Sequence, residues 1–150
     1  MLEWMHDTSV VEYMQANFAE KTLEDCQRFI ARSLEDQENL HLAIANDADE
    51  YMGTVSLKAI SPERSAAEFA ITVRKCAMGQ GYSRFAIREI LRIGKEEYGL
   101  RHIYWYVNRA NERAVRFYDK NGCRRAAFAE IRPLLDEPRE DDPALLWYLA

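Results

Sequence analysis

Two glycines between a predicted strand end and a predicted helix start form the clearest chemical pattern in the sequence. Gly79 and Gly81 lie in the stretch from Val73 to Ser83. Glycine permits a tight turn and lets a ligand approach the exposed backbone N–H groups, and a helix N-terminus adds partial positive charge. Such a turn suits a phosphate or pyrophosphate. It lacks the Lys-Ser/Thr pair of a P-loop NTPase, and Arg84 replaces the third glycine of a dinucleotide-binding fold. Taken alone, the stretch is more typical of a structural turn.

A second motif follows at a separation that fits one helix and one strand. Its residues are Asn111, Ala114, Phe117, Tyr118, Gly122 and Cys123. Together the two motifs resemble the GNAT superfamily of acetyl-CoA-dependent N-acetyltransferases. The family pattern Arg/Gln-x-x-Gly-x-Gly/Ala aligns with residues 78–83, and its pattern Asn-x-x-Ala-x-x-Phe-Tyr-x-x-x-Gly-Phe aligns with the second motif. Residues 51–57 look like the family's third strand, and residues 2–7 are similar to the opening of the ribosomal-protein and amino-sugar acetyltransferases. The resemblance covers essentially the whole chain.

The resemblance implies acetyl-CoA as the cosubstrate and no metal. It assigns the phosphates to the glycine turn and the pantetheine arm to a strand that splays from its neighbour. The residues assigned to the cofactor are Ile71, Val73, Met78, Gly79, Gln80, Gly81, Tyr82, Ser83 and Asn111. Met78 replaces the family's Arg or Gln, so we expect backbone donors to hold the phosphates. The basic side chains that would aid them are those of Arg74, Lys75 or Arg84.

Acetyl transfer to an amine needs a general base. An alkyl amine has a pKa of about 10.4 and is mostly protonated at neutral pH, so a proton must be removed before the nitrogen attacks. Glu68 falls where many family members carry a glutamate, and it shares a strand face with Ala70 and Thr72. It is therefore the candidate base. A strand carboxylate that faces solvent or an arginine is an equal alternative.

The departing CoA thiolate benefits from an acid. Tyr118 occupies the family's position for this acid. A tyrosine beside Phe117 at helical spacing is otherwise a core residue, and that alternative stays open. The resemblance also implies that free strand N–H groups near Ile71 and Val73 contact the cofactor, and a free N–H can stabilise the oxyanion of the intermediate. Asn111 is expected to cap the short helix and, by resemblance, to touch CoA.

A mixed α/β layer fold is needed to position these residues. Apolar periodicity and polar start residues predict an N-terminal helix after Asp7, a second helix from Thr22 and a long helix over residues 82–98. The predicted apolar face of the second helix consists of Leu23, Cys26, Ile30 and Leu34. Strands are predicted over residues 40–45, 51–57, 66–73, 101–107, 123–131 and 144–149, with a short helix over residues 111–120. We expect one GNAT-like domain over residues 1–150, with a right-handed crossover between the strands at 66–73 and 101–107.

The family's usual first strand is missing, because residues 1–7 have the pattern of a helix start. The predicted strand over residues 40–45 should then lie at a sheet edge, which proteins usually cover. We expect the edge to be covered by a partner copy in a homodimer or by rearranged N-terminal helices, or the chain to have a truncated start.

The net charge of −5 is unevenly distributed. Residues 1–70 carry −9, residues 71–125 carry +8 and residues 126–150 carry −4. One basic segment in an acidic chain indicates a discrete anionic ligand rather than a surface that coats nucleic acid. Solvated helix faces are the alternative explanation. The acidic first segment, where the family builds its acceptor wall, favours a cationic acceptor.

Several other classes of protein are excluded by composition. The three cysteines form no CxxC pair and the three histidines have no HxxxH or HExxH spacing, so we expect neither a disulfide framework nor a metal site. Apolar runs are too short to span a bilayer, and the N-terminus lacks a signal peptide's basic start. We therefore expect a cytoplasmic protein with no membrane partner. No ribonucleoprotein motif accompanies the aromatic residues 104–106, so no nucleic-acid partner is expected.

The function predicted from the sequence is direct transfer of an acetyl group from acetyl-CoA to a primary amine. The acceptor is a small-molecule or peptide amine: a protein N-terminus, an amino sugar on a nucleotide carrier, a polyamine and an aminoglycoside all remain open. Two alternatives belong to other classes. One is a non-catalytic acyl-CoA-binding or regulatory module, and the other is an RNA-associated protein that uses the basic segment.

Overall fold

Six strands form one mixed sheet in the computed structural model, which describes every residue from Met1 to Ala150. The strands are β1 (Leu40–Ala45), β2 (Tyr51–Ser61), β3 (Ala66–Val73), β4 (His102–Asn108), β5 (Arg125–Ala126) and β6 (Leu145–Leu149). Their order across the sheet is β1-β2-β3-β4-β6-β5. Only β3 and β4 pair in parallel, and the helix α4 (Tyr82–Glu96) connects them, which confirms the predicted parallel crossover connection.

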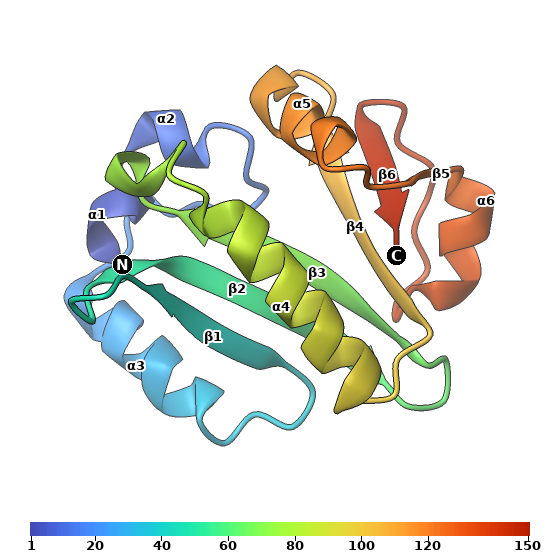
Figure 1. Cartoon of the computed structure of the whole chain (residues 1–150), viewed down its shortest axis with the longest axis horizontal. Helices are drawn as coiled ribbons and strands as arrows, with labels where there is room; N and C mark the ends of the chain where they lie inside the picture. The colour runs from blue at the N-terminus through green and yellow to red at the C-terminus, as the bar shows by residue number, and fades with distance from the viewer.

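Helices cover both faces of the sheet (Figure 1). Besides α4 they are α1 (Leu2–Met5), α2 (Thr8–Val11), α3 (Leu23–Ser33), α5 (Glu112–Lys120) and α6 (Phe128–Ile131), with the 3-10 turns η1 (Lys75–Ala77) and η2 (Arg132–Leu134). On one face α4 and α5 contribute Ile90 and Tyr118 to the main core, against which Leu40 of β1 packs. Because side chains alternate along a strand, His41 points to the opposite face, where it meets Phe29 of α3.

Local sequence signals set the ends of several elements. Thr22 and Asp25 form a capping box at the start of α3: the Asp25 N–H donates to Thr22 Oγ1 (3.2 Å), and the Thr22 N–H donates to Asp25 Oδ2 (2.9 Å). Asn46 Oδ1 closes the hairpin between β1 and β2 by accepting hydrogen bonds from the N–H groups of Ala48 and Glu50, both at 2.9 Å. These bonds join residues close in sequence, so the sequence alone contains the signal.

The segment after α5 differs from its prediction. The sequence predicts one strand over residues 123–131, but only Arg125–Ala126 pairs with β6, and Phe128–Ile131 form α6. The Glu130 carboxylate accepts a hydrogen bond from the Ala127 N–H (2.9 Å), which stabilises the first turn of a helix. This helix also buries its last residue against β4 and β6. The strand prediction is therefore wrong for the second half of the segment.

Helix α3 is rotated relative to its prediction. Of the predicted apolar face only Cys26 is buried, against Met5 of α1. Leu23, Ile30 and Leu34 are 61%, 50% and 82% exposed. The residues that α3 turns toward the space above the sheet are Asp25, Arg28, Phe29 and Arg32. The helix therefore lines the cavity with charged side chains that stay partly or fully exposed, and it leaves the apolar ones on its outer side.

Strand β1 lies at the edge of the sheet, as expected from the missing first strand. Residues 2–5 form α1 rather than a strand, and β1 pairs with β2 alone. The outer edge of β1 therefore has no strand partner. None of the helices has the length and apolar run that crossing a membrane requires.

Candidate active site

Strands β3 and β4 pair along only part of their length. Their parallel register runs from Ala66↔His102 to Glu68↔Tyr104. Beyond that point β4 pairs with β6 alone, and the ribbons of β3 and β4 diverge (Figure 1). The remainder of β3 therefore has a free edge toward β4.

The N–H groups of Ile71 and Val73 point into this divergence. The Arg74 N–H donates to the Met52 carbonyl oxygen of β2 at 2.8 Å, and in an antiparallel pair such bonds recur at every second residue. The N–H of Thr72 therefore also faces β2, while those of Ile71 and Val73 face the side from which β4 has turned away. Two backbone donors are thus free at the positions that the resemblance assigns to pantetheine.

The turn between β3 and α4 presents a run of free backbone donors. Gly79 and Gly81 have φ angles of +77° and +88°, a region that glycine enters without strain. None of the N–H groups from Gly79 to Arg84 has a hydrogen-bond partner in the chain. They lie at the positive end of the α4 dipole, so the turn is suited to a phosphate group.

The side chains of Met78 and Gln80 shape this turn and connect it to α5. Gln80 Nε2 donates to the Cys76 carbonyl oxygen at 2.6 Å, which ties the turn to η1. The Met78 sulfur contacts the guanidinium of Arg113. Arg113 is exposed and forms no ion pair, so it adds a cation beside the turn that the sequence analysis missed. Arg113 lies two residues after Asn111 in the second motif, and this position could have identified it from the sequence.

Arg74 is held elsewhere and is not free to aid the phosphates. Its Nε and Nη2 donate to the two carboxylate oxygens of Glu3 at 3.0 and 2.7 Å, and its Nη1 donates to the Tyr51 carbonyl oxygen at 3.1 Å. Hydrogen bonding to Arg74 holds the pKa of Glu3 below its usual value. Arg74 therefore fastens α1 to the sheet. Lys75 and Arg84 are exposed and unpaired, so they remain the free cations on the turn itself.

Tyr118 of α5 lies where β3 and β4 diverge. Its ring centroid is 6.4 Å from that of Phe69 on β3 and 5.4 Å from that of Trp105 on β4. Tyr118 is 7% exposed, and burial raises the pKa of its hydroxyl above the usual value, so the hydroxyl is protonated at neutral pH. Asn111 begins the same helix, and its Oδ1 accepts a hydrogen bond from the Ala114 N–H at 3.2 Å. The cap and the candidate acid are thus fixed on one short helix.

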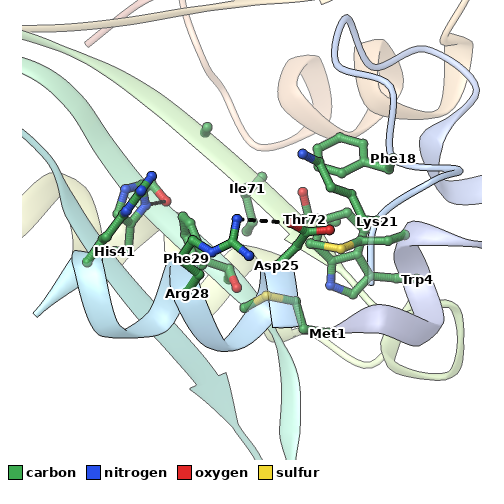
Figure 2. A pocket seen from close by; sticks show the side chains of 15 residues that line it. Met1, Trp4, Phe18, Lys21, Asp25, Arg28, Phe29, His41, Ile71 and Thr72 are labelled. Carbon is green, nitrogen blue, oxygen red and sulfur yellow. Dashed lines mark hydrogen bonds and ion pairs between the residues drawn. The ribbon is translucent and has the colours of Figure 1, made fainter. Parts of the chain in front are cut away.

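A cavity of about 400 Å³ lies on the opposite face of the sheet, under α1 and α3. Figure 2 shows Trp4 and Phe18 toward one end and His41 toward the other. The residues that form its sheet wall are His41, Thr54, Ser56, Ala70, Ile71 and Thr72. The β3 segment Ala70–Thr72 also borders the divergence from β4. The cavity and the predicted cofactor track therefore share one wall.

Glu68, the candidate base, lies on the same face of β3 as Thr72 but does not line this cavity. Its Oε1 is 2.8 Å from the Lys58 Nζ on β2, and its side chain is 21% exposed. This geometry is close to the alternative considered from the sequence, a strand carboxylate that faces solvent or an arginine, with Lys58 in the place of the arginine. The base role of Glu68 stays a prediction.

His41 lines the cavity, although the sequence analysis considered it only as a metal-ligand candidate. Its Nδ1 lies 2.7 Å from Ser56 Oγ. Burial lowers the pKa of the imidazole below its ordinary value of 6.5, while Asp36 opposes the shift and Lys58 adds to it. His41 is therefore uncharged at neutral pH. The sequence could have placed His41 on this face, because neighbouring residues of a strand face opposite sides and Leu40 packs against the main core.

Comparison with known proteins agrees with the fold and with the family that the sequence resembles. The family model of the acetyltransferase (GNAT) domain matches residues 1–124. No curated protein matches the sequence. Among solved structures, a spermidine N-acetyltransferase from Vibrio cholerae in complex with CoA and spermine has a TM-score of 0.76 at 18% identity, over 99% of this chain and 84% of that chain. A dodecameric structure of spermidine N-acetyltransferase from Vibrio cholerae has a TM-score of 0.70 at 20% identity, over 99% of this chain and 86% of that chain. Because the family model covers most of the sequence, the chain belongs to the GNAT acetyltransferase family.

Proposed function

We propose that this chain is an acetyl-CoA-dependent enzyme that moves an acetyl group directly to a primary amine. The observation that carries the proposal is the run of unpartnered N–H groups from Gly79 to Arg84, at the C-terminal end of the strand that diverges from β4. Tyr118 supports it, because its ring is buried against Phe69 of β3 and Trp105 of β4 and its hydroxyl is protonated at neutral pH. A module that only binds acyl-CoA needs the backbone donors but has no use for an acid there.

The cofactor track follows from these groups. The pyrophosphate of acetyl-CoA accepts hydrogen bonds from the turn, and Lys75, Arg84 and Arg113 supply positive charge nearby. The pantetheine arm lies along the free edge of β3, where the N–H groups of Ile71 and Val73 lack partners. The cofactor thereby extends the sheet into the divergence.

The reaction then needs one nucleophile, one oxyanion donor and one acid. The amine nitrogen attacks the thioester carbonyl carbon, so a C–N bond forms and the C–S bond breaks. A free strand N–H at Ile71 or Val73 stabilises the charge on the thioester oxygen. The acceptor's ammonium group loses one proton to the base, which passes it to solvent, and a second as the tetrahedral intermediate collapses. Tyr118 donates its proton to the departing sulfur and is reprotonated by the second of these protons. The products are the acetamide and the free CoA thiol.

Two residues are candidates for the base. Glu68 is the one expected from the sequence, and His41 is favoured by one specific observation: it lines the cavity in its uncharged form. The substitutions Glu68→Gln and His41→Gln separate them through the pH dependence of kcat/KM. Removing the base abolishes the acidic limb of that profile, whereas removing the other residue leaves the limb in place.

The assembly we propose is a homo-oligomer. The outer edge of β1 has no strand partner, and Leu23, Ile30 and Leu34 are exposed together on the outer side of α3. One structural neighbour, the Vibrio cholerae spermidine N-acetyltransferase, is described as dodecameric. Sedimentation of the wild type against Leu34→Glu tests the proposal: a reduced mass in the variant supports it, and a monomeric wild type overturns it.

The enzyme itself is tested by thiol release from acetyl-CoA across a panel of amines, with the acetylated product identified by mass. We expect release that depends on the amine and disappears in Gly81→Val. CoA binding without turnover of any amine would contradict the enzyme and support the binding module.

A further inference from the structure

The cavity under α3 carries more positive than negative charge. Its charged lining residues are Lys21, Asp25, Arg28 and Arg32. The Asp25 carboxylate is already occupied: its Oδ2 accepts hydrogen bonds from the Thr22 N–H (2.9 Å) and hydroxyl (3.0 Å), and its Oδ1 lies 3.6 Å from Arg28 Nη1 (Figure 2). Lys21 and Arg32 are exposed side chains that line the cavity without an ion pair or side-chain hydrogen bond, and the charge of Lys21 helps to lower the pKa of Asp25. Arg32 therefore has no anionic partner in the chain, and Lys21 shares Asp25 with Arg28, so both remain available to an anion in the cavity.

This charge balance reverses the expectation drawn from the sequence. Residues 1–70 carry a net charge of −9, which favours a cationic acceptor. Asp25 is the only one of their carboxylates that lines the cavity. Others are held outside it, such as Glu3 by Arg74 and Glu68 by Lys58. The acidic character of the first segment therefore lies on other surfaces, and the rotation of α3 leaves the cavity basic.

We propose that the acceptor is a small amine that also carries a carboxylate or phosphate group. This inference rests on the proposed acetyltransferase activity and names the substrate class of its cavity. The anionic group binds to Lys21 and Arg32, and the amine points toward the β3 segment Ala70–Thr72, where the cavity borders the predicted thioester position. Hydrogen bonds between charged groups are among the strongest in proteins, so this end fixes the orientation.

The remaining lining fits such a molecule. A volume of about 400 Å³ lies within the range of small-molecule sites. Trp4, Phe18 and Phe29 offer apolar surface for its carbon skeleton, while Thr54 and Ser56 offer hydroxyl groups on the sheet side. A polyamine such as spermidine has no anionic group for the two available cations and would meet like charge.

The test compares matched acceptors that differ only in the anion. The pairs are glucosamine 6-phosphate against glucosamine, and phenylalanine against phenylalaninamide, with spermidine as the polyamine. We expect the anionic member of at least one pair to be acetylated with a kcat/KM about tenfold or more above that of its neutral partner and of spermidine. The two pairs separate a phosphate requirement from a carboxylate requirement.

Charge-reversed variants give the control. Lys21→Glu and Arg32→Glu should remove the preference for the anionic member, and Arg101→Glu, an exposed arginine outside the cavity, should retain it. Acetylation of spermidine in preference to every anionic acceptor would overturn the inference and leave the acetyltransferase intact. An anion preference that survives both variants would also overturn it. Failure of every amine, with CoA still bound, would overturn the acetyltransferase and this inference with it.

Discussion

The two sides of the site are built from different parts of the chain. On the cofactor side the groups are backbone N–H donors, at Ile71 and Val73 and from Gly79 to Arg84, fixed by one strand edge and one turn. On the acceptor side they are side chains of α1, α3 and three strands, spread from Met1 to Thr72. The cofactor side therefore depends on local geometry, and the acceptor side depends on how separate elements pack.

This difference predicts how each side responds to change. Backbone donors keep their chemistry whatever side chains surround them, so the turn tolerates Met78 where its family pattern has Arg or Gln. The chemistry of the cavity depends on its side chains. A rotation of α3 would replace Arg28 and Arg32 in the lining by Leu23 and Ile30. Substitutions should therefore affect CoA binding on the first side and acceptor choice on the second.

Gly81→Val should have the largest effect, because it acts on the turn that holds the backbone donors. A side chain at a φ of +88° is strained, although no atom lies within 4 Å of the added Cβ, so the turn must change its path. We expect CoA to raise the melting temperature of the wild type by mass action and to leave that of the variant unchanged.

Gly99→Val is the matched control. Gly99 has a φ of +64° and equally open surroundings, but it follows the other end of α4. This variant should lose a similar amount of stability and keep the full CoA-induced shift. A shift that persists in Gly81→Val would place the ligand elsewhere.

Tyr118→Phe should lower kcat by about a hundredfold and leave CoA affinity nearly unchanged. Its task is confined to the transition state, and general acids contribute at the low end of their range when the leaving group is a thiolate. Tyr148→Phe is the control, because its ring centroid is 5.2 Å from that of Tyr118 but its hydroxyl donates to Asp119 Oδ1 (3.1 Å) instead. A kcat for Tyr118→Phe within about threefold of the wild type would make Tyr118 a core residue only.

Arg74→Gln should have a smaller effect, and on the acceptor side alone. Arg74 fastens α1 to the sheet through Glu3 and Tyr51, so its loss should loosen the wall of the cavity. We expect a severalfold rise in the KM of the amine with no change in the KM of acetyl-CoA. Glu3→Gln should reproduce the result. The opposite pattern, a raised KM for acetyl-CoA, would put Arg74 on the cofactor side.

His41 should give the smallest effect, a pH dependence of stability. Its pKa in the folded chain is lowered below 6.5 because burial disfavours the imidazolium. Below pH 6.5 the unfolded chain therefore binds the proton more readily, and the free energy of unfolding falls as the pH drops through the folded pKa. Denaturant titrations between pH 7 and about pH 5 should show this decline in the wild type and a weaker one in His41→Gln. Equal slopes would mean that the cavity leaves His41 as solvated as the unfolded chain does.

Much of the cofactor side could be predicted from the sequence, because its signals are local. The cap at Asn111 and the two glycines of the turn act within four residues of themselves. The divergence of β3 from β4 is not a local feature, and it came from the family resemblance rather than from the residues.

The acceptor side could not be predicted in the same way. Apolar spacing in α3 favours burial of Leu23, Ile30 and Leu34, yet the packing of α1 against Cys26 sets a different rotation. Which cations line the cavity follows from that rotation and not from any motif. Similarly, the contact between Arg74 and Glu3 joins residues 71 positions apart, so no pattern in the sequence marks it.

The central claim is that the free N–H groups of the turn and of β3 hold acetyl-CoA. Nitrogen–proton correlation spectra recorded during a titration with CoA observe these groups one by one. The account predicts that the resonances of Gly79 to Arg84, Ile71 and Val73 shift together to saturation, while those on the outer side of α3 stay in place. Saturating shifts confined to α3 and the cavity, with the turn unaffected, would contradict it.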